Sequence, residues 1–264
     1  MERTLSLPGL DGKPVVVDTV RIEALLAADP AMAAATLLQA ARRGHPHAQT
    51  WLGQLYLDGR GVPRDAGEAC YWFRRAAHAG LPMAMNMLGR CHDHGWGTPV
   101  DYTLAAIWYR RAGEAGSDWG CYNYAHLLDQ GRGVPRDTAA AIVWFERAAA
   151  MGHGRAMHFL GSCYERGHGV PRDRARAIEL YRHAAATGDY RGLCSWASVL
   201  CERGEIDAAL ACLRRAVAQA PAHYLRALAR TLEAAAHATL RDFGLRIAAQ
   251  LDAAAPPSAA RETG

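Results

Sequence analysis

The chain has 264 residues, of which half are hydrophobic and 21% are charged. A chain of this length can bury a sizeable core in one large domain or two small ones. Its only lysine is Lys13, and this excludes P-loop and Schiff-base chemistry, which depend on a lysine placed within a folded site. The formal net charge of +4 is spread along the chain without a run of like charges, so we expect neither a nucleic-acid partner nor a membrane partner.

The first residues predict a leader over 1–17 that is extended or forms a short hairpin, since P-G-L-D-G-K supplies turn residues. This stretch lacks the apolar core of a secretory signal, and no apolar run in the chain reaches the length of a membrane helix. The seven cysteines include no C-x-x-C pair, which favours free thiols and hence a cytoplasmic location.

Four consecutive segments repeat with a period of 36 residues and no gaps. They begin at Ala48, at Met83 and Ala84, at Gly120 and at Ala156. Each carries two loop glycines, an aspartate and an aromatic pair at fixed positions: Gly59, Gly95, Gly131 and Gly167; Gly61, Gly97, Gly133 and Gly169; Asp65, Asp101, Asp137 and Asp173; Trp72-Phe73, Trp108-Tyr109, Trp144-Phe145 and Leu180-Tyr181. A fixed period of this length is typical of solenoids.

Each copy predicts two helices joined by a glycine-containing loop. In the first copy the first helix runs from about Ala48 to Asp58, and Gly59 ends it in a left-handed conformation. Asp65 is placed to cap the second helix, with Glu68 as its capping-box partner. We expect the tryptophans of the second helices, Trp72, Trp108 and Trp144, to be largely buried. Glycines in the middle of the first helices (Gly53, Gly89 and Gly161) indicate close packing between helices.

The flanking segments read as atypical end repeats, which a solenoid needs to cover its terminal core faces. The expected organisation is a capping helix pair at 18–47, the four repeats at 48–191, a degenerate repeat at 192–221, two closing helices at 222–252 and a disordered tail at 253–264.

The repeat pattern, shown by A-Q-T-W-L-G-Q-L-Y-L-D-G-R-G-V-P-R-D in the first copy, resembles the Sel1-like repeat, a relative of the tetratricopeptide repeat. The second copy departs from it with T-P-V in the loop, and the degenerate fifth resembles a plain tetratricopeptide repeat. The resemblance is to bacterial members and implies an all-α fold, a right-handed α/α superhelix that acts as an adaptor between proteins.

No catalytic motif stands in the sequence, so we expect neither an enzyme nor a cofactor. The densest group of metal-ligand types is Cys91, His92 and His94. Because neighbouring residues on a helix point about 100° apart, and Cys91 stands at a core position of the repeat, we expect no metal there. A metal- or redox-responsive regulator that uses this group, for example as an accessory to iron uptake, is the alternative function.

In the related tetratricopeptide fold the first helices line the concave face, so their non-core residues become the candidate partner-binding residues. They are Gln54, Asn86, Arg90, Asp93, Tyr122, His126, Asp129, His158, Ser162 and Glu165. The three acids, Asp93, Asp129 and Glu165, share one repeat position, and they form either an acidic ladder for a basic peptide or a solvated rim. The second-helix arginines Arg74, Arg75, Arg110 and Arg111 are expected to stay solvated. The function predicted is a non-enzymatic scaffold that binds a protein or peptide in the concave groove; the oligomeric state is left open.

Overall fold

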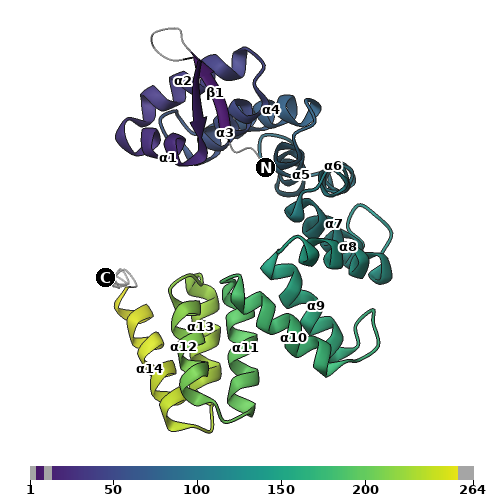
Figure 1. Ribbon diagram of the computed structural model, residues 1–264, viewed down its shortest axis with the longest axis vertical. Coiled ribbons are helices and arrows are strands. Elements are labelled where there is room, and N and C mark those ends of the chain that lie inside the picture. Colours follow the sequence, from purple (N-terminus) through teal and green to yellow (C-terminus); the bar gives the residue numbers. More distant parts are fainter. Residues whose placement is uncertain (1–3, 9–13, 255–264) are drawn as a thin grey trace, which may run out of the picture. The chain divides into compact units, whose positions relative to one another are not determined.

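The computed structural model describes residues 4–8 and 14–254 as an all-α repeat solenoid preceded by a β-hairpin. The chain divides into two compact units, Met1–His153 and Gly154–Gly264. The first unit contains β1 (Thr4–Pro8), β2 (Pro14–Asp18), α1 (Thr19–Ala28), α2 (Pro30–Arg42), α3 (Pro46–Asp58), α4 (Ala66–His78), α5 (Pro82–His94), α6 (Tyr102–Glu114), α7 (Asp118–Gln130) and α8 (Thr138–Ala150) (Figure 1). The second contains α9 (Gly154–Arg166), α10 (Arg174–Ala186), α11 (Tyr190–Glu202), α12 (Ile206–Val217), α13 (Ala222–Glu233) and α14 (Ala238–Ala253).

The segments that the sequence assigns to the two ends fall only partly within the described residues. β1 and β2 pair antiparallel, with Leu5 opposite Val17 and Leu7 opposite Val15. The rest of the 1–17 leader, residues 1–3 and 9–13, lies outside the described part. The tail expected to be disordered from 253 onward begins inside α14, and its residues 255–264 lie outside the description.

Aspartates and glycines delimit the helices of each repeat as the sequence predicts. Asp65 accepts hydrogen bonds from the backbone N–H groups of Gly67 and Glu68 at 2.8 and 3.0 Å, and so caps α4. The prediction that Glu68 is the capping-box partner of Asp65 is wrong, because the Glu68 carboxylate accepts a hydrogen bond from Nε1 of Trp72 at 3.0 Å instead. The predicted left-handed glycines are confirmed, with φ of 69°, 72°, 68° and 75° at Gly59, Gly95, Gly131 and Gly167.

We expect the replacement of Gly131 by valine to destabilise the protein by more than about 1 kcal/mol, because a β-branched residue is strained at a φ of 68°. A Cβ at this position would also lie 3.1 Å from the Cβ of Arg136. Thermal unfolding followed by circular dichroism measures the effect. Gly131→Asn is the control, since asparagine tolerates the left-handed region, and its melting temperature should lie above that of Gly131→Val. Equal melting temperatures for wild type and Gly131→Val would contradict the C-cap assignment.

In the first, second and fourth repeats, an aromatic ring of the second helix lies on a glycine of the first helix. A Cβ built on Gly53 would lie 2.7 Å from the ring of Phe73, and one on Gly89 would lie 2.6 Å from the ring of Tyr109. Gly161 meets Tyr181 in the same way in the second unit. The close packing that the mid-helix glycines predict is therefore confirmed.

The tryptophans one position earlier are less uniformly buried than the sequence predicts. Trp72 is 5% exposed, but Trp108 and Trp144 are only half-buried. Their rings lie under guanidinium groups, with Arg111 at 5.2 Å from the Trp108 centroid and Arg147 at 4.6 Å from the Trp144 centroid. The fully buried rings are those of Phe73, Tyr109 and Phe145, which directly follow the tryptophans.

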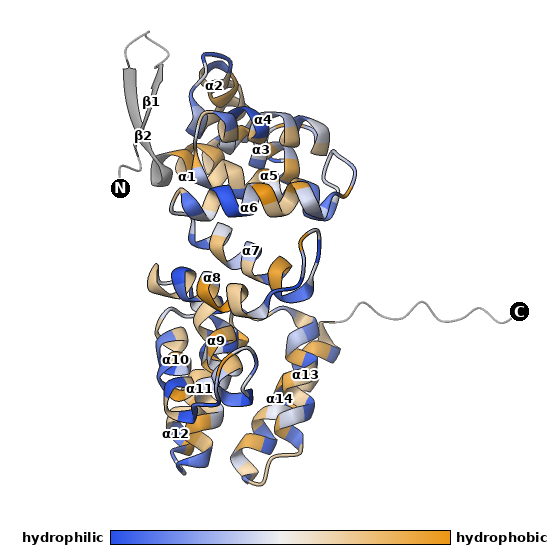
Figure 2. Cartoon of the chain, turned by 90° about the vertical axis from the view of Figure 1, so that its right-hand side faces the viewer, coloured by the Kyte–Doolittle hydropathy of each residue, from blue (hydrophilic) through white to orange (hydrophobic). Residues whose placement is uncertain are grey.

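Figure 2 shows hydrophobic and hydrophilic residues side by side along the helices, as expected for helices with one buried face. In the part of the chain that the structure describes, every helix is too short or too polar to span a bilayer.

Candidate functional site

The candidate residues of the first unit lie on the first helices α3, α5 and α7. All are half-buried except Asn86, which is 6% exposed. Gln54 on α3 donates two hydrogen bonds to the carboxylate of Asp58, one turn further along the same helix. The amide of Gln54 is therefore held by its own helix.

Asn86 bridges two repeats. Nδ2 of Asn123 on α7 donates a 2.8 Å hydrogen bond to Oδ1 of Asn86 on α5. In the second unit, the side chains of Ser195 on α11 and His158 on α9 lie 3.1 Å apart in the equivalent arrangement, also 37 residues apart in sequence. Sequence reasoning missed Asn123 and Ser195 because it compared positions 36 apart, whereas the lateral neighbour on the next first helix stands one residue further on.

The three acids that share one repeat position do not have equal surroundings. Asp93 accepts a 3.2 Å hydrogen bond from the Tyr109 hydroxyl and pairs with Arg132 at 3.3 Å, and its side chain is only 14% exposed. Glu165 accepts a 2.9 Å bond from the Tyr181 hydroxyl. Burial, followed by the nearby carboxylate, raises the pKa of both tyrosines. Two of the three acids thus bond the core tyrosine of their own repeat.

The third copy has Phe145 where those tyrosines stand, so no hydroxyl lies at that ring position. Asp129 therefore cannot repeat the acid–tyrosine bond of the other two copies. The hydrogen bonds that Asp93 and Glu165 accept within their own repeats give these two acids a structural role.

Arg90 and Tyr122 belong to the α5/α7 face, which comprises the exposed parts of Arg90, Trp96, Trp119, Tyr122 and His126. The Arg90 guanidinium lies 4.7 Å from the Trp96 ring centroid, and its Nη1 lies 3.6 Å from the sulfur of Met87. The Tyr122 ring meets His126 edge-on at 4.5 Å and stacks on His153 at 4.6 Å. These contacts hold a cation and an aromatic surface in fixed orientations.

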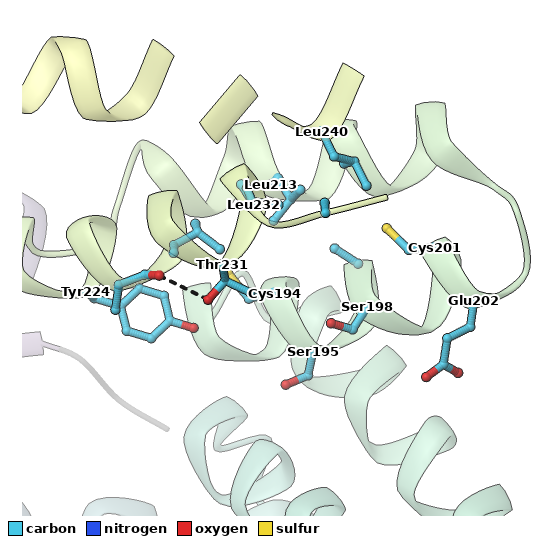
Figure 3. A pocket seen from close by; sticks show the side chains of 14 residues that line it. Cys194, Ser195, Ser198, Cys201, Glu202, Leu213, Tyr224, Thr231, Leu232 and Leu240 are labelled. Carbon is cyan, nitrogen blue, oxygen red and sulfur yellow. Dashed lines mark hydrogen bonds between the residues drawn. The ribbon is translucent and has the colours of Figure 1, made fainter. Parts of the chain in front are cut away.

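An open cavity of about 580 Å³ lies in the second unit between α11 and α13, and Figure 3 shows the side chains around it. Its apolar lining includes leucines from three helices, namely Leu213, Leu228, Leu232 and Leu240. Polar groups at the cavity include Ser195, Ser198, Glu202 and Thr231, and the Thr231 hydroxyl is held by a 3.1 Å bond to the carbonyl of Ala227.

This cavity adjoins the candidate residues of the second unit. Ser195 lines it and is bonded to His158, so α9 and the cavity share a polar contact. Burial lowers the pKa of His158, which favours the neutral imidazole. Ser162 and Glu165 also lie on α9, half-buried and exposed respectively. Sequence reasoning missed the cavity because its residues lie in the degenerate repeat and the closing helices, where the 36-residue register no longer applies.

Cys91, His92 and His94 do not share one environment. Cys91 is fully buried in the core against the helix α4 that carries Cys70, and His92 is 7% exposed. His94 is exposed, and its ring lies 4.9 Å from Trp96. Burial lowers the pKa of His92. Among the described residues, no group of three His, Cys, Asp or Glu side chains is placed to hold a metal ion.

A family model matches the chain in sequence, and solved structures match it in fold. The Sel1 repeat family model matches residues 46–81, 82–117, 120–153 and 154–189, which are the pairs α3/α4 to α9/α10. The comparison with curated proteins gives no match.

Among solved structures, a Sel1 repeat protein from Oxalobacter formigenes is 26% identical, with a TM-score of 0.75 over 89% of this chain and 99% of that one. A protective antigen of uropathogenic Escherichia coli that displays an SLR fold is also 26% identical, with a TM-score of 0.65 over 88% of this chain. The chain spans only 54% of that antigen. An immunity protein from Pseudomonas aeruginosa, 19% identical with a TM-score of 0.50 over 72% of this chain and 76% of that one, shares the fold alone.

The four segments matched by the family model follow one another along the chain and together make up more than half of it. Each coincides with one of the helix pairs in the structure. The protein therefore belongs to the Sel1 repeat family.

Proposed function

We propose that the protein is a non-enzymatic scaffold that binds a protein or peptide partner through the exposed faces of its first helices. The Sel1 repeat fold is commonly a protein–protein interaction scaffold. The observation that carries the proposal is the α5/α7 face, where a guanidinium and several aromatic rings are fixed by mutual contacts yet remain accessible. The proposal includes no catalytic step and no cofactor.

The α5/α7 face offers the groups that recognise an extended peptide. Arg90 supplies hydrogen-bond donors for carbonyl or carboxylate oxygens, and Trp119, which is 41% exposed, lies edge-on to Tyr122 with their centroids 6.0 Å apart. Tyrosine, tryptophan and arginine are the residues that most often dominate binding energy at interfaces. Rigid aromatic groups also lose little conformational entropy when a partner binds.

The cavity between α11 and α13 supplies the complementary apolar element in the second unit. Its leucine walls can take up an apolar side chain of the partner, while Ser198 and Thr231 can bond the adjoining polypeptide backbone. This unit therefore engages its ligand mainly through apolar contact, whereas the α5/α7 face engages its ligand through charge and aromatic stacking.

An acidic ladder of Asp93, Asp129 and Glu165 is not part of the proposal. Asp93 is neutralised by Arg132 and its side chain is mostly buried, so it offers little charge to a basic peptide. Nor does any observation favour the metal-responsive alternative at Cys91, His92 and His94, whose environments differ as described above.

We place the protein in the cytoplasm as part of this proposal, because all seven cysteines are free thiols in the structure. Its proposed partners are proteins, with neither nucleic acid nor membrane among them. The scattered arginines support this choice, since Arg110, Arg132 and Arg174 each pair with a carboxylate instead of gathering into a basic stripe.

The double variant Arg90→Ala with Tyr122→Ala tests the proposed face. We expect it to abolish partner capture in an affinity purification read by mass spectrometry, because it removes the cation and the central ring together. Its helical circular dichroism spectrum should be retained and its melting temperature nearly so, since both side chains are half-buried and not part of the core stripe.

The matched control truncates two exposed second-helix side chains, Arg110→Ala with Arg111→Ala, and should capture the same partners as wild type. Loss of the partners by this control, with capture kept by the Arg90/Tyr122 variant, would move the binding surface to the second helices. A third variant, Leu228→Asp, places a charge in the α11/α13 cavity. Partners that this variant no longer captures are held by the second unit, and partners that it still captures are held by the first.

A further inference from the structure

A second cavity in the first unit, distinct from the α5/α7 face, has the composition of an anion site. It has a volume of about 370 Å³ and is lined by Gly44, Gln49, Arg74, Arg75, His78 and Ala79. Two guanidinium groups and an imidazole thus line a cavity without a single acidic residue. Among the described residues, no carboxylate forms an ion pair with Arg74 or Arg75.

Gln49 is the group that makes this cavity more than a basic surface. It is 2% exposed, and its Nε2 donates a 3.0 Å hydrogen bond to the carbonyl of Ala41. Its Oε1 is buried and has no hydrogen-bond partner within the described chain. An acceptor left unsatisfied in the interior destabilises the folded state, so the fold alone gives no reason to keep it.

The repeat register shows that a buried amide is not needed at this place. The residues 36, 72 and 108 positions after Gln49 are Met85, Cys121 and Met157, all apolar or weakly polar. The positions after His78 are Glu114, Ala150 and Ala186. The combination of a buried acceptor with Arg74, Arg75 and His78 therefore occurs in the first repeat alone.

The basic side chains of the cavity are oriented by their neighbours. Nη1 of Arg75 donates a 3.1 Å bond to the Tyr71 hydroxyl, and its guanidinium lies 5.8 Å from the Trp72 ring centroid. Nδ1 of His78 lies 2.8 Å from the Arg74 carbonyl and donates to it, so Nε2 of the neutral ring is a hydrogen-bond acceptor. A guanidinium has five N–H donors, so both arginines keep donors for an oxyanion.

We propose that this cavity binds a phosphate group that carries a proton, either as inorganic phosphate or as a phosphate monoester. The arginines donate to its unprotonated oxygens, and the P–OH group donates to Oε1 of Gln49, which satisfies the buried acceptor. A phosphate monoester has its second pKa at about 6, so the protonated form is present near neutral pH. Sulfate has no proton to donate at this pH, and the acceptor therefore selects phosphate over sulfate. The arginines at 74 and 75, expected from the sequence to be solvated, here become ligand-binding groups.

Isothermal titration of the full chain at pH 6.5 and constant ionic strength tests this site, with inorganic phosphate, O-phosphoserine and sulfate as the probes. Phosphate, O-phosphoserine or both should bind at least tenfold more tightly than sulfate. The tighter of the two phosphate probes identifies the free ion or the monoester as the natural form. Failure of both phosphate probes to bind, or equal binding of sulfate, would overturn the proposal.

Three variants assign the binding to these residues. Gln49→Met installs the residue of two other repeats, so it should fold with an unchanged or higher melting temperature and bind phosphate and sulfate equally weakly. Arg74→Gln with Arg75→Gln should weaken phosphate binding at least tenfold. Arg110→Gln with Arg111→Gln changes the same two positions of the next repeat, where Met85 replaces the amide, and should bind phosphate as wild type does. Equal loss in both arginine pairs would show unspecific charge attraction and refute the site.

Discussion

Replacement of Gly133 by alanine is expected to destabilise the first unit by about 3 kcal/mol or more. The φ of Gly133 is 69°, and an L-residue pays about 1–2 kcal/mol there. A Cβ at this position would also overlap the backbone carbonyl group of Tyr102, in the first turn of α6. That overlap adds the cost of overpacking, about 1–3 kcal/mol, because a backbone cannot rotate aside as a side chain can.

Gly116→Ala separates the two costs. Gly116 has a φ of 92°, but a Cβ added there would meet no atom within 4 Å. This control should therefore lose only the conformational part, about 1–2 kcal/mol. Urea unfolding followed by circular dichroism at 222 nm compares the two variants at equal protein concentration. Unfolding of both variants at the same urea concentration would contradict the close contact between the loop of the third repeat and α6.

Truncation of Phe73 to alanine is expected to cost about 3–5 kcal/mol, since the ring is fully buried between α4 and the middle of α3. The same contact makes a sharper prediction about Gly53. In the wild type, Gly53→Ala should destabilise by about 1 kcal/mol or more, because its Cβ would lie 2.7 Å from the ring. In the Phe73→Ala background, Gly53→Ala should stabilise by up to about 1 kcal/mol, because the helix propensity of alanine then acts without a clash.

This reversal of sign is read from a double-mutant cycle of four unfolding curves. A matched cycle on Gly89 and Tyr109 should behave in the same way, since the Tyr109 ring lies 2.6 Å from the Cβ position of Gly89. Destabilisation by Gly53→Ala of the same size in both backgrounds would mean that the glycine serves something other than the ring.

The sequence predicted the repeated local structure well because local rules set it. An aspartate that caps α4 and a left-handed glycine that ends α3 act within a few residues of themselves, so their roles are visible in the pattern. The same holds for the small residues under the aromatic rings, since only close packing offsets the helix-propensity cost of Gly53 or Gly89.

The phase of the core was less accurate, for a geometrical reason. The residues of the Trp-Phe and Trp-Tyr pairs lie about 100° apart on the helix, and both are large and apolar. Which of the two faces the preceding helix depends on how the helices cross, and that is decided by packing between them. Phe73 and Tyr109 occupy the core position, whereas Trp108 is half-buried beneath Arg111.

The sequence by itself determined the family, the 36-residue period, the helix boundaries and the first helices as bearers of the candidate residues, because these follow from spacing along the chain. The tertiary structure decided which groups several of the candidates contact. Asn86 and His158 bridge neighbouring helices through side-chain hydrogen bonds, and Asp93 accepts a hydrogen bond from Tyr109 and pairs with Arg132. The tertiary structure also formed the α11/α13 cavity and the basic cavity beside Gln49, neither of which obeys the repeat register. The physical reason is that a hydrogen bond or a cavity depends on groups from different helices, and their distance in space is not encoded in any one segment.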